Sequence, residues 1–136
     1  MKYIILILFT FNIYAQQEVP EKYWIEDNNF ENKINEKEAF GSNLDKVVVV
    51  EFWAKFNEAN CFGDWNKLED VVYYRVDIAK APQAKKKYKV RMAPTLIIFK
   101  GGVKEKVFKA GLDLVLPADL EEIQESINEI NTASQF

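Results

Sequence analysis

The segment KVVVVEFWA, at positions 46–54, is the feature of this sequence that most constrains its fold. It is a continuous apolar run of strand length, rich in β-branched valines, and only Glu51 interrupts it. A strand with one face in solvent alternates apolar and polar residues, whereas a strand covered on both faces is apolar throughout. The segment therefore predicts a central strand with a packed layer on each side.

Strand-like and helix-like segments alternate along the rest of the chain. Before the central strand we expect a short edge strand at 23–26 and a helix over 28–40, with Asn28 or Asn29 as N-cap and Phe30, Ile34 and Glu38 on one face. After it we expect a further helix from the N-cap residue Asp64, a strand at 71–78 and a short helix over 81–90 opened by Pro82. The chain then continues with a hairpin of 94–100 and 104–110 around the turn GGV, and with an amphipathic helix over 117–130 that has Leu120, Ile123, Ile127 and Ile130 on one side. This order predicts an α/β fold with a central mixed sheet and helices on both faces.

Composition excludes several classes of function. The 136 residues are one domain's worth, and a net charge of −3 with a pI near 5.1 argues against nucleic acid as the main partner. The sequence contains no histidine and a single cysteine, Cys61. Zinc sites of the usual kind and Ser-His-Asp or Cys-His devices are therefore not expected, and neither is any metal or cofactor.

The first fifteen residues, MKYIILILFTFNIYA, have the layout of a secretory signal peptide. One lysine precedes an apolar run, and the small residue Ala15 predicts cleavage before Gln16. A membrane anchor is the alternative, but the run is short for a span. We therefore expect a periplasmic or secreted protein without a stable anchor after cleavage. It divides into a signal peptide (1–15), a flexible lead-in (16–22), a domain (23–130) and a tail (131–136).

Three stretches carry a resemblance to a known family: VVVVEFWAKF, YYRVDIAKAP and KYKVRMAPTLIIFKGG, followed by a C-terminal helix. Together they resemble the thioredoxin family from Tyr23 to Ile130, which implies a thioredoxin-like fold. In that family the proline equivalent to Pro94 follows a cis peptide bond, here to Ala93, and lies beside the active site. The alternative is that Pro94 is an ordinary proline at the start of a strand.

The same resemblance shows that both sulfur positions have changed. Thioredoxins carry Trp-Cys-x-x-Cys after Phe-Trp-Ala, and here Phe56 takes the aromatic position. Asn57 takes the position of the attacking cysteine and Asn60 that of the resolving cysteine, while Cys61 lies one place beyond. Dithiol exchange needs one thiolate to attack and a second thiol to release the mixed disulfide. The degenerate motif therefore predicts a redox-inactive protein.

Glu51 matches a buried acid of the family that accepts a proton from the inner cysteine. Burial within an apolar strand should raise its pKa. The alternative is that Glu51 points to a strand edge or pairs with a lysine, because buried unpaired carboxylates are rare.

The remaining aromatic residues and the proline predict a binding surface. Trp53, Phe56, Phe62 and Trp65 lie around the former active site, either as core packing or as an apolar surface for an extended peptide. We expect a protein or peptide partner near Pro94, with Trp53 and Phe56 lining a shallow groove against it. The predicted binding residues are Trp53, Phe56, Asn57, Asn60, Ala93 and Pro94. The basic run Lys85–Arg91 is interpreted as a solvated helix face.

Two functions follow from these expectations. The first is a redox-inactive thioredoxin-like module that binds a protein or peptide. The second is a single-cysteine thiol oxidoreductase that acts through mixed disulfides at Cys61. A lone thiol without a basic or helical neighbour has an ordinary pKa, which favours the first.

Overall fold

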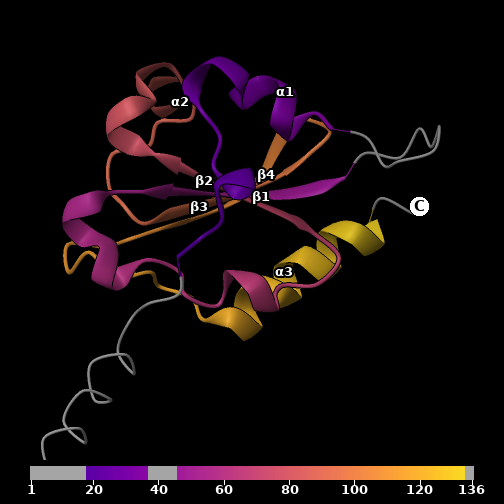
Figure 1. Cartoon of the computed structure of the whole chain (residues 1–136). Coiled ribbons are helices and arrows are strands. Elements are labelled where there is room, and N and C mark those ends of the chain that lie inside the picture. Colours follow the sequence, from indigo (N-terminus) through magenta and orange to yellow (C-terminus); the bar gives the residue numbers. More distant parts are fainter. Residues whose placement is uncertain (1–17, 37–45, 134–136) are drawn as a thin grey trace, which may run out of the picture.

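The computed structural model describes residues 18–36 and 46–133 of the chain (Figure 1). The predicted signal peptide and Glu38 lie outside these residues. Within them, no helix is both long and apolar enough to cross a membrane.

A four-stranded mixed sheet forms the centre of the molecule. It consists of β1 (Val47–Trp53), β2 (Val72–Asp77), β3 (Thr95–Lys100) and β4 (Val103–Lys109), in the order β2-β1-β3-β4. β1 runs parallel to β2 and antiparallel to β3, and β4 forms a hairpin with β3. β1 therefore has a neighbour on each side and is buried from Val47 to Phe52, as its continuous apolar sequence predicts.

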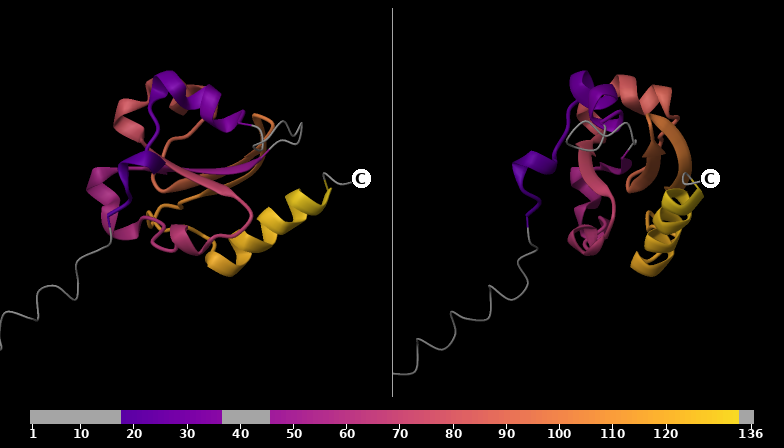
Figure 2. Two further views of the ribbon diagram at one scale, coloured as in Figure 1. Left: turned by 45° about the vertical axis from the view of Figure 1, so that its right-hand side comes forward. Right: turned by 90° about the vertical axis from the view of Figure 1, so that its right-hand side faces the viewer.

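Helices cover both faces of this sheet (Figures 1 and 2). α1 (Phe30–Ile34) and α2 (Pro82–Lys87) lie on one face, and α3 (Leu120–Ala133) lies on the other. Successive strand residues point to opposite faces, so Val48, Val50 and Phe52 pack toward α1 and α2 while Val47 and Val49 pack toward α3. The predicted α/β architecture is confirmed.

The sequence around α2 fixes its start and its end. Pro82 occupies the first turn, and the Asp27 carboxylate accepts hydrogen bonds from the backbone N–H groups of Gln83 and Ala84, both at 2.9 Å. At the other end Lys89 adopts a left-handed conformation with φ 56°. The Val90 N–H donates to the Lys85 carbonyl and the Lys89 N–H to the Lys86 carbonyl, which is the Schellman pattern. The chain reverses here and leads into β3.

Two predicted elements are absent, and within the described residues the helix expected over 28–40 spans only α1, because residues 27–29 form a 3₁₀ turn and Asn35 ends the helix. In place of a strand at 23–26 the chain forms a 3₁₀ turn, η3 (Glu21–Tyr23), and then a single bridge between Trp24 and Arg75 at the edge of β2. The pairing stops there because the chain turns away into η4 (Asp27–Asn29), which Glu26 and Asn29 close with a capping box.

The helix expected after Asp64 is also absent. The described chain between β1 and β2 contains only the 3₁₀ turns η5 (Lys55–Asn60) and η6 (Trp65–Lys67), and the Asp64 side chain makes no capping hydrogen bond. Likewise, only the 3₁₀ turn η7 (Ile78–Lys80) separates β2 from α2. The segment from Asn60 to Val71 is too short to add an α-helix and still return to the start of β2.

Candidate functional site

Three segments that are distant in sequence meet at the carboxyl end of β1. They are the turn η5, the residues before β3, and the loop that follows β4. The Ala93–Pro94 peptide bond is cis. The Pro94 carbonyl accepts a hydrogen bond from the Ala110 N–H at 3.0 Å, which joins the second segment to the third.

Asn57 connects all three segments. Its Nδ2 donates to the Ala93 carbonyl at 2.8 Å and to the Leu114 carbonyl at 2.9 Å. Its Oδ1 accepts from Asn60 Nδ2 at 2.9 Å. Asn57 is 8% exposed. The two asparagines at the predicted sulfur positions therefore contact one another, and the amide of Asn57 has every hydrogen-bonding group in use.

Apolar side chains next to this amide are exposed to solvent. Phe56 is 78% exposed, Leu112 is 99% exposed and Val115 is 46% exposed. Phe56 precedes Asn57, and Leu112 and Val115 lie within two residues of Leu114, so the hydrogen bond from Asn57 to Leu114 joins the two segments that carry these side chains. We refer to Phe56, Leu112 and Val115 as the Phe56 surface.

Trp53 lines two cavities, and Phe56 lines neither of them. Its ring packs edge-on against Trp24, with 5.1 Å between centroids, and it lines a cavity of about 460 Å³ with Cys61 and another of about 810 Å³ with Asp77. Phe56 and Pro94 line neither of these two. Trp53 Nε1 is buried and has no hydrogen-bond partner.

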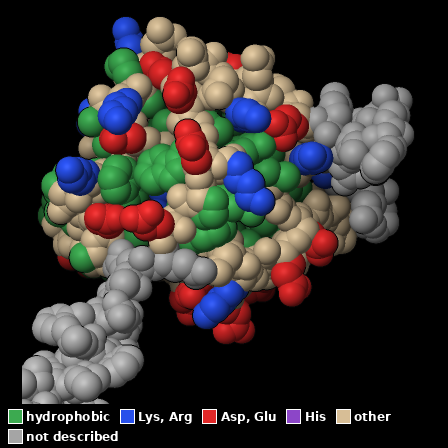
Figure 3. Space-filling view, viewed as in Figure 1, with side chains coloured by type: hydrophobic (Ala, Val, Ile, Leu, Met, Phe, Trp, Pro, Cys, Tyr) green, Lys and Arg blue, Asp and Glu red, His purple; other side chains and the backbone are tan. Residues whose placement is uncertain are grey.

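Hydrophobic side chains gather across the middle of the face that residues 18–28 cross (Figure 3).

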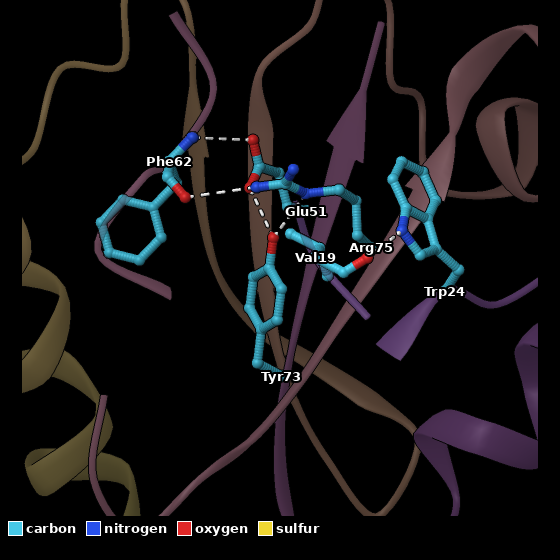
Figure 4. A network of polar contacts seen from close by, with 6 residues as sticks. All are labelled: Val19, Trp24, Glu51, Phe62, Tyr73 and Arg75. Carbon is cyan, nitrogen blue, oxygen red and sulfur yellow. Dashed lines mark hydrogen bonds and ion pairs between the residues drawn. The ribbon is translucent and has the colours of Figure 1, made fainter. Parts of the chain in front are cut away.

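Glu51 is fully buried, and donors surround its carboxylate (Figure 4). Arg75 Nη2 donates to Oε1 at 3.0 Å, and the Tyr73 hydroxyl donates to the same oxygen at 2.7 Å. The Phe62 N–H donates to Oε2 at 2.9 Å. Neither a strand edge nor a lysine is involved, so Glu51 follows neither form of the alternative expected from the sequence.

The charges of this network depend on one another. Burial raises the pKa of Glu51, and the adjacent Arg75 guanidinium works in the opposite direction by stabilising the carboxylate. Burial, followed by the nearby Glu51, raises the pKa of Tyr73, so the phenol remains a donor. Arg75 also donates to the Tyr73 oxygen through Nε at 2.8 Å and to the Phe62 carbonyl through Nη2 at 3.3 Å. Glu51 is thus paired with a cation, and both of its carboxylate oxygens accept hydrogen bonds within the fold.

Tyr73 and Arg75 were not predicted from the sequence as part of the site. The signal was present, since Glu51 pairs directly with Arg75 in the parallel register of β1 and β2. Opposite charges at matched positions of two apolar strands indicate a buried ion pair once the register is known. Leu112 and Val115 were also missed, because an apolar residue in a loop carries no specific signal of its own.

Cys61 ends the turn η5 and lies in a loop, half-buried. Burial raises the pKa of its thiol above the usual range, and the neighbouring Arg75 offsets only part of that rise. No helix N-terminus stabilises a thiolate at this position. Among the residues that the structure describes, no group of three histidine, cysteine, aspartate or glutamate side chains could hold a metal ion.

Comparisons with known proteins identify the family to which this fold belongs. The Thioredoxin family model matches residues 21–122. A thioredoxin from Malassezia sympodialis is 31% identical over 93 residues, which cover 62% of this chain and 82% of that relative. The crystal structure of Malassezia sympodialis thioredoxin (Mala s 13) superposes with a TM-score of 0.57 at 26% identity, covering 78% of this chain and 89% of the other.

A second solved structure, that of a designed protein, has the same TM-score of 0.57 at 21% identity, covers 84% of this chain and 96% of its own, and shows the fold alone. The family model, by contrast, spans the central sheet, the Ala93–Pro94 bond and both asparagines. This chain belongs to the thioredoxin family.

Proposed function

We propose that this chain is a redox-inactive thioredoxin-like domain that binds a protein or an extended peptide at the Phe56 surface, beside Ala93 and Pro94. The observation that carries the proposal is the amide of Asn57. It stands where the family's attacking sulfur would be, and it holds the Ala93 and Leu114 carbonyls instead. An amide cannot form a mixed disulfide, so what remains at this position is a structural connection.

The exposed side chains support a binding role. Phe56 and Leu112 are large apolar residues, and both are mostly exposed to solvent. Adjacent exposed apolar groups mark interaction sites more often than isolated ones do. Because Asn57 fixes the loops beneath them, little ordering entropy is lost when a partner binds. The apolar leader at positions 1–15 supports a periplasmic or secreted location for this activity.

Removing the apolar groups tests the proposal. Peptides selected from a displayed random library on the wild-type protein are expected to bind the double variant Phe56→Ser, Leu112→Ser about tenfold more weakly, because aromatic and large apolar anchors dominate such interfaces. Val103→Ser is the matched control, since Val103 is 60% exposed at the β3–β4 turn. Binding should be measured by fluorescence anisotropy. Equal affinity for wild type and the double variant would count against the Phe56 surface.

A second candidate function is a single-cysteine thiol oxidoreductase. The observation that favours it is the cavity of about 460 Å³ that Cys61 lines together with Arg75, which could receive a small thiol. The raised pKa of Cys61 argues against it, because the thiolate is the attacking species and is scarce at neutral pH.

Turnover of a disulfide substrate separates the two functions. We expect the wild type and Cys61→Ser to show equal, background-level rates at neutral pH, with and without added glutathione. Without glutathione, a chain with one thiol cannot release its own mixed disulfide. With glutathione, release is possible, but the raised pKa of Cys61 leaves little thiolate to make the first attack. Glutathione-dependent turnover that disappears in Cys61→Ser would establish the single-cysteine enzyme instead.

A further inference from the structure

A cavity of about 360 Å³ lies between the segment that follows α2 and the edge strand β4. Its charged lining consists of Lys89, Arg91, Lys104 and Lys109. All four side chains are exposed. No aspartate or glutamate of the described chain lines this cavity. The acidic residue of α1, Glu31, is already engaged by Lys87 at 2.7 Å and by the Tyr88 hydroxyl at 2.9 Å. Glu105 adjoins Lys104 on β4 but does not line the cavity.

The lysines of β4 alone have a simpler explanation. Edge strands often carry lysine, which prevents pairing with the edges of other molecules. That explanation does not cover Lys89 and Arg91, which come from a different element. The Schellman turn at the end of α2 reverses the chain and carries both residues to the side of β4. The fold thus assembles cations from two segments around one cavity.

The overall charge makes this concentration unusual. The chain as a whole carries a net charge of −3, so at long range it repels acidic molecules. Exposed charges interact only over roughly 8–10 Å at physiological ionic strength. Within that range the cavity presents neighbouring cations without a lining carboxylate. Their mutual repulsion is relieved when an anion enters.

The residues before β3 connect the cavity to the proposed binding site along the chain. Met92 and Thr95 line the cavity, and they flank the Ala93–Pro94 bond. Arg91 precedes Pro94 by three residues, so the cavity and the proposed binding site lie next to each other along the backbone.

From this placement we infer that the protein or peptide partner carries a cluster of aspartate or glutamate side chains, which enter the cavity lined by Lys89, Arg91, Lys104 and Lys109. This inference rests on the proposed function and names the chemistry of its partner. Carboxylates pair well with both ammonium and guanidinium groups, and complementary charge of this kind gives specificity and faster association.

Titration of the ¹⁵N-labelled full chain with a hexaglutamate peptide tests the inference. We expect amide shifts confined to residues 88–92 and 104–109, and weakening as NaCl rises from about 50 to about 300 mM. The variant Lys104→Glu, Lys109→Glu should bind about tenfold more weakly, because each replacement removes an attraction and adds a repulsion. The control Lys85→Glu, Lys86→Glu changes the net charge equally, but these side chains do not line the cavity, so its affinity should change less than about twofold.

The inference would be overturned by the absence of hexaglutamate binding, whether or not inorganic tripolyphosphate binds. It would also be overturned by equal weakening in both lysine variants, or by hexalysine that binds as well as hexaglutamate. The outcome is separable from that of the proposed function. The double variant Phe56→Ser, Leu112→Ser should bind hexaglutamate as the wild type does. If the selected peptides depend on Phe56 but hexaglutamate does not bind at all, the Phe56 surface is supported and the acidic partner is rejected.

Discussion

Replacement of Arg75 by methionine is expected to lower the free energy of unfolding by about 3–5 kcal/mol, because it leaves a buried carboxylate without its cation. Arg75 is 5% exposed and Glu51 is 0% exposed, so water cannot take the place of the guanidinium. Methionine fills a similar volume, which keeps the packing loss small. Urea unfolding followed by circular dichroism measures the change.

The pH dependence of this variant has a definite sign. Burial already raises the pKa of Glu51 above its ordinary value of 4.5, and loss of Arg75 raises it further. Above 4.5 the unfolded chain has lost this proton while the folded chain still binds it. Stability then falls as the pH rises through the raised pKa. The destabilisation relative to wild type should therefore be smaller near pH 4.5 than at pH 7.

Two further variants serve as controls for this result. Adding Glu51→Gln to Arg75→Met should restore more than half of the lost stability, because no charge then remains buried. Lys87→Met breaks the exposed pair with Glu31 and should change stability by less than about 1 kcal/mol. A loss in Arg75→Met no larger than that in Lys87→Met would show that the buried pair contributes little.

Replacement of Asn57 by alanine is expected to destabilise the protein by about 2–4 kcal/mol, because the Ala93 and Leu114 carbonyls each lose a donor. Asn57→Asp should be at least as damaging at neutral pH, since a carboxylate offers no donor and repels both carbonyl oxygens. Faster amide hydrogen exchange should appear in the loop that contains Leu114, which would lose its connection to η5.

Asn60→Ala is the matched control for Asn57. Asn60 is exposed and its side chain donates one hydrogen bond, to Asn57 Oδ1. Its replacement should change stability by less than about 1 kcal/mol and leave exchange in the loop near Leu114 unchanged. If Asn57→Ala behaved like Asn60→Ala, the three segments at the carboxyl end of β1 would be held together by other contacts.

Much of the fold could be predicted because local sequence and tertiary packing agree. The run of valines at 47–50 predicts a buried strand, and β1 is buried at these positions. Gly101 and Gly102 both have positive φ, at 58° and 77°, which is the conformation that a two-residue hairpin turn requires and glycine readily supplies. Ile123 and Ile127 of α3 are fully buried, as their spacing on the amphipathic helix predicts.

The site was less predictable because it depends on relations between segments. Trp53 is the last residue of β1, and the chain then enters η5, so no periodicity relates its direction to that of Phe56. The partner of Glu51 depends on the register of β1 against β2, which a single sequence does not specify. The position of Leu114, whose φ is 61°, depends on a hydrogen bond from a residue 57 positions earlier in the chain.

The buried pair of Glu51 and Arg75 bears on whether two cysteine substitutions could give this chain a dithiol activity. Asn57→Cys and Asn60→Cys would supply two thiols, but the acid expected to accept a proton from the inner one is held by the Arg75 guanidinium. Losing Arg75 first would pass through an unstable intermediate. Gaining the thiols first would give no proton acceptor, together with the loss of the hydrogen bonds of Asn57. Under the proposed function, neither order of mutation is neutral, so a gain of redox catalysis requires coordinated changes on two strands and a turn.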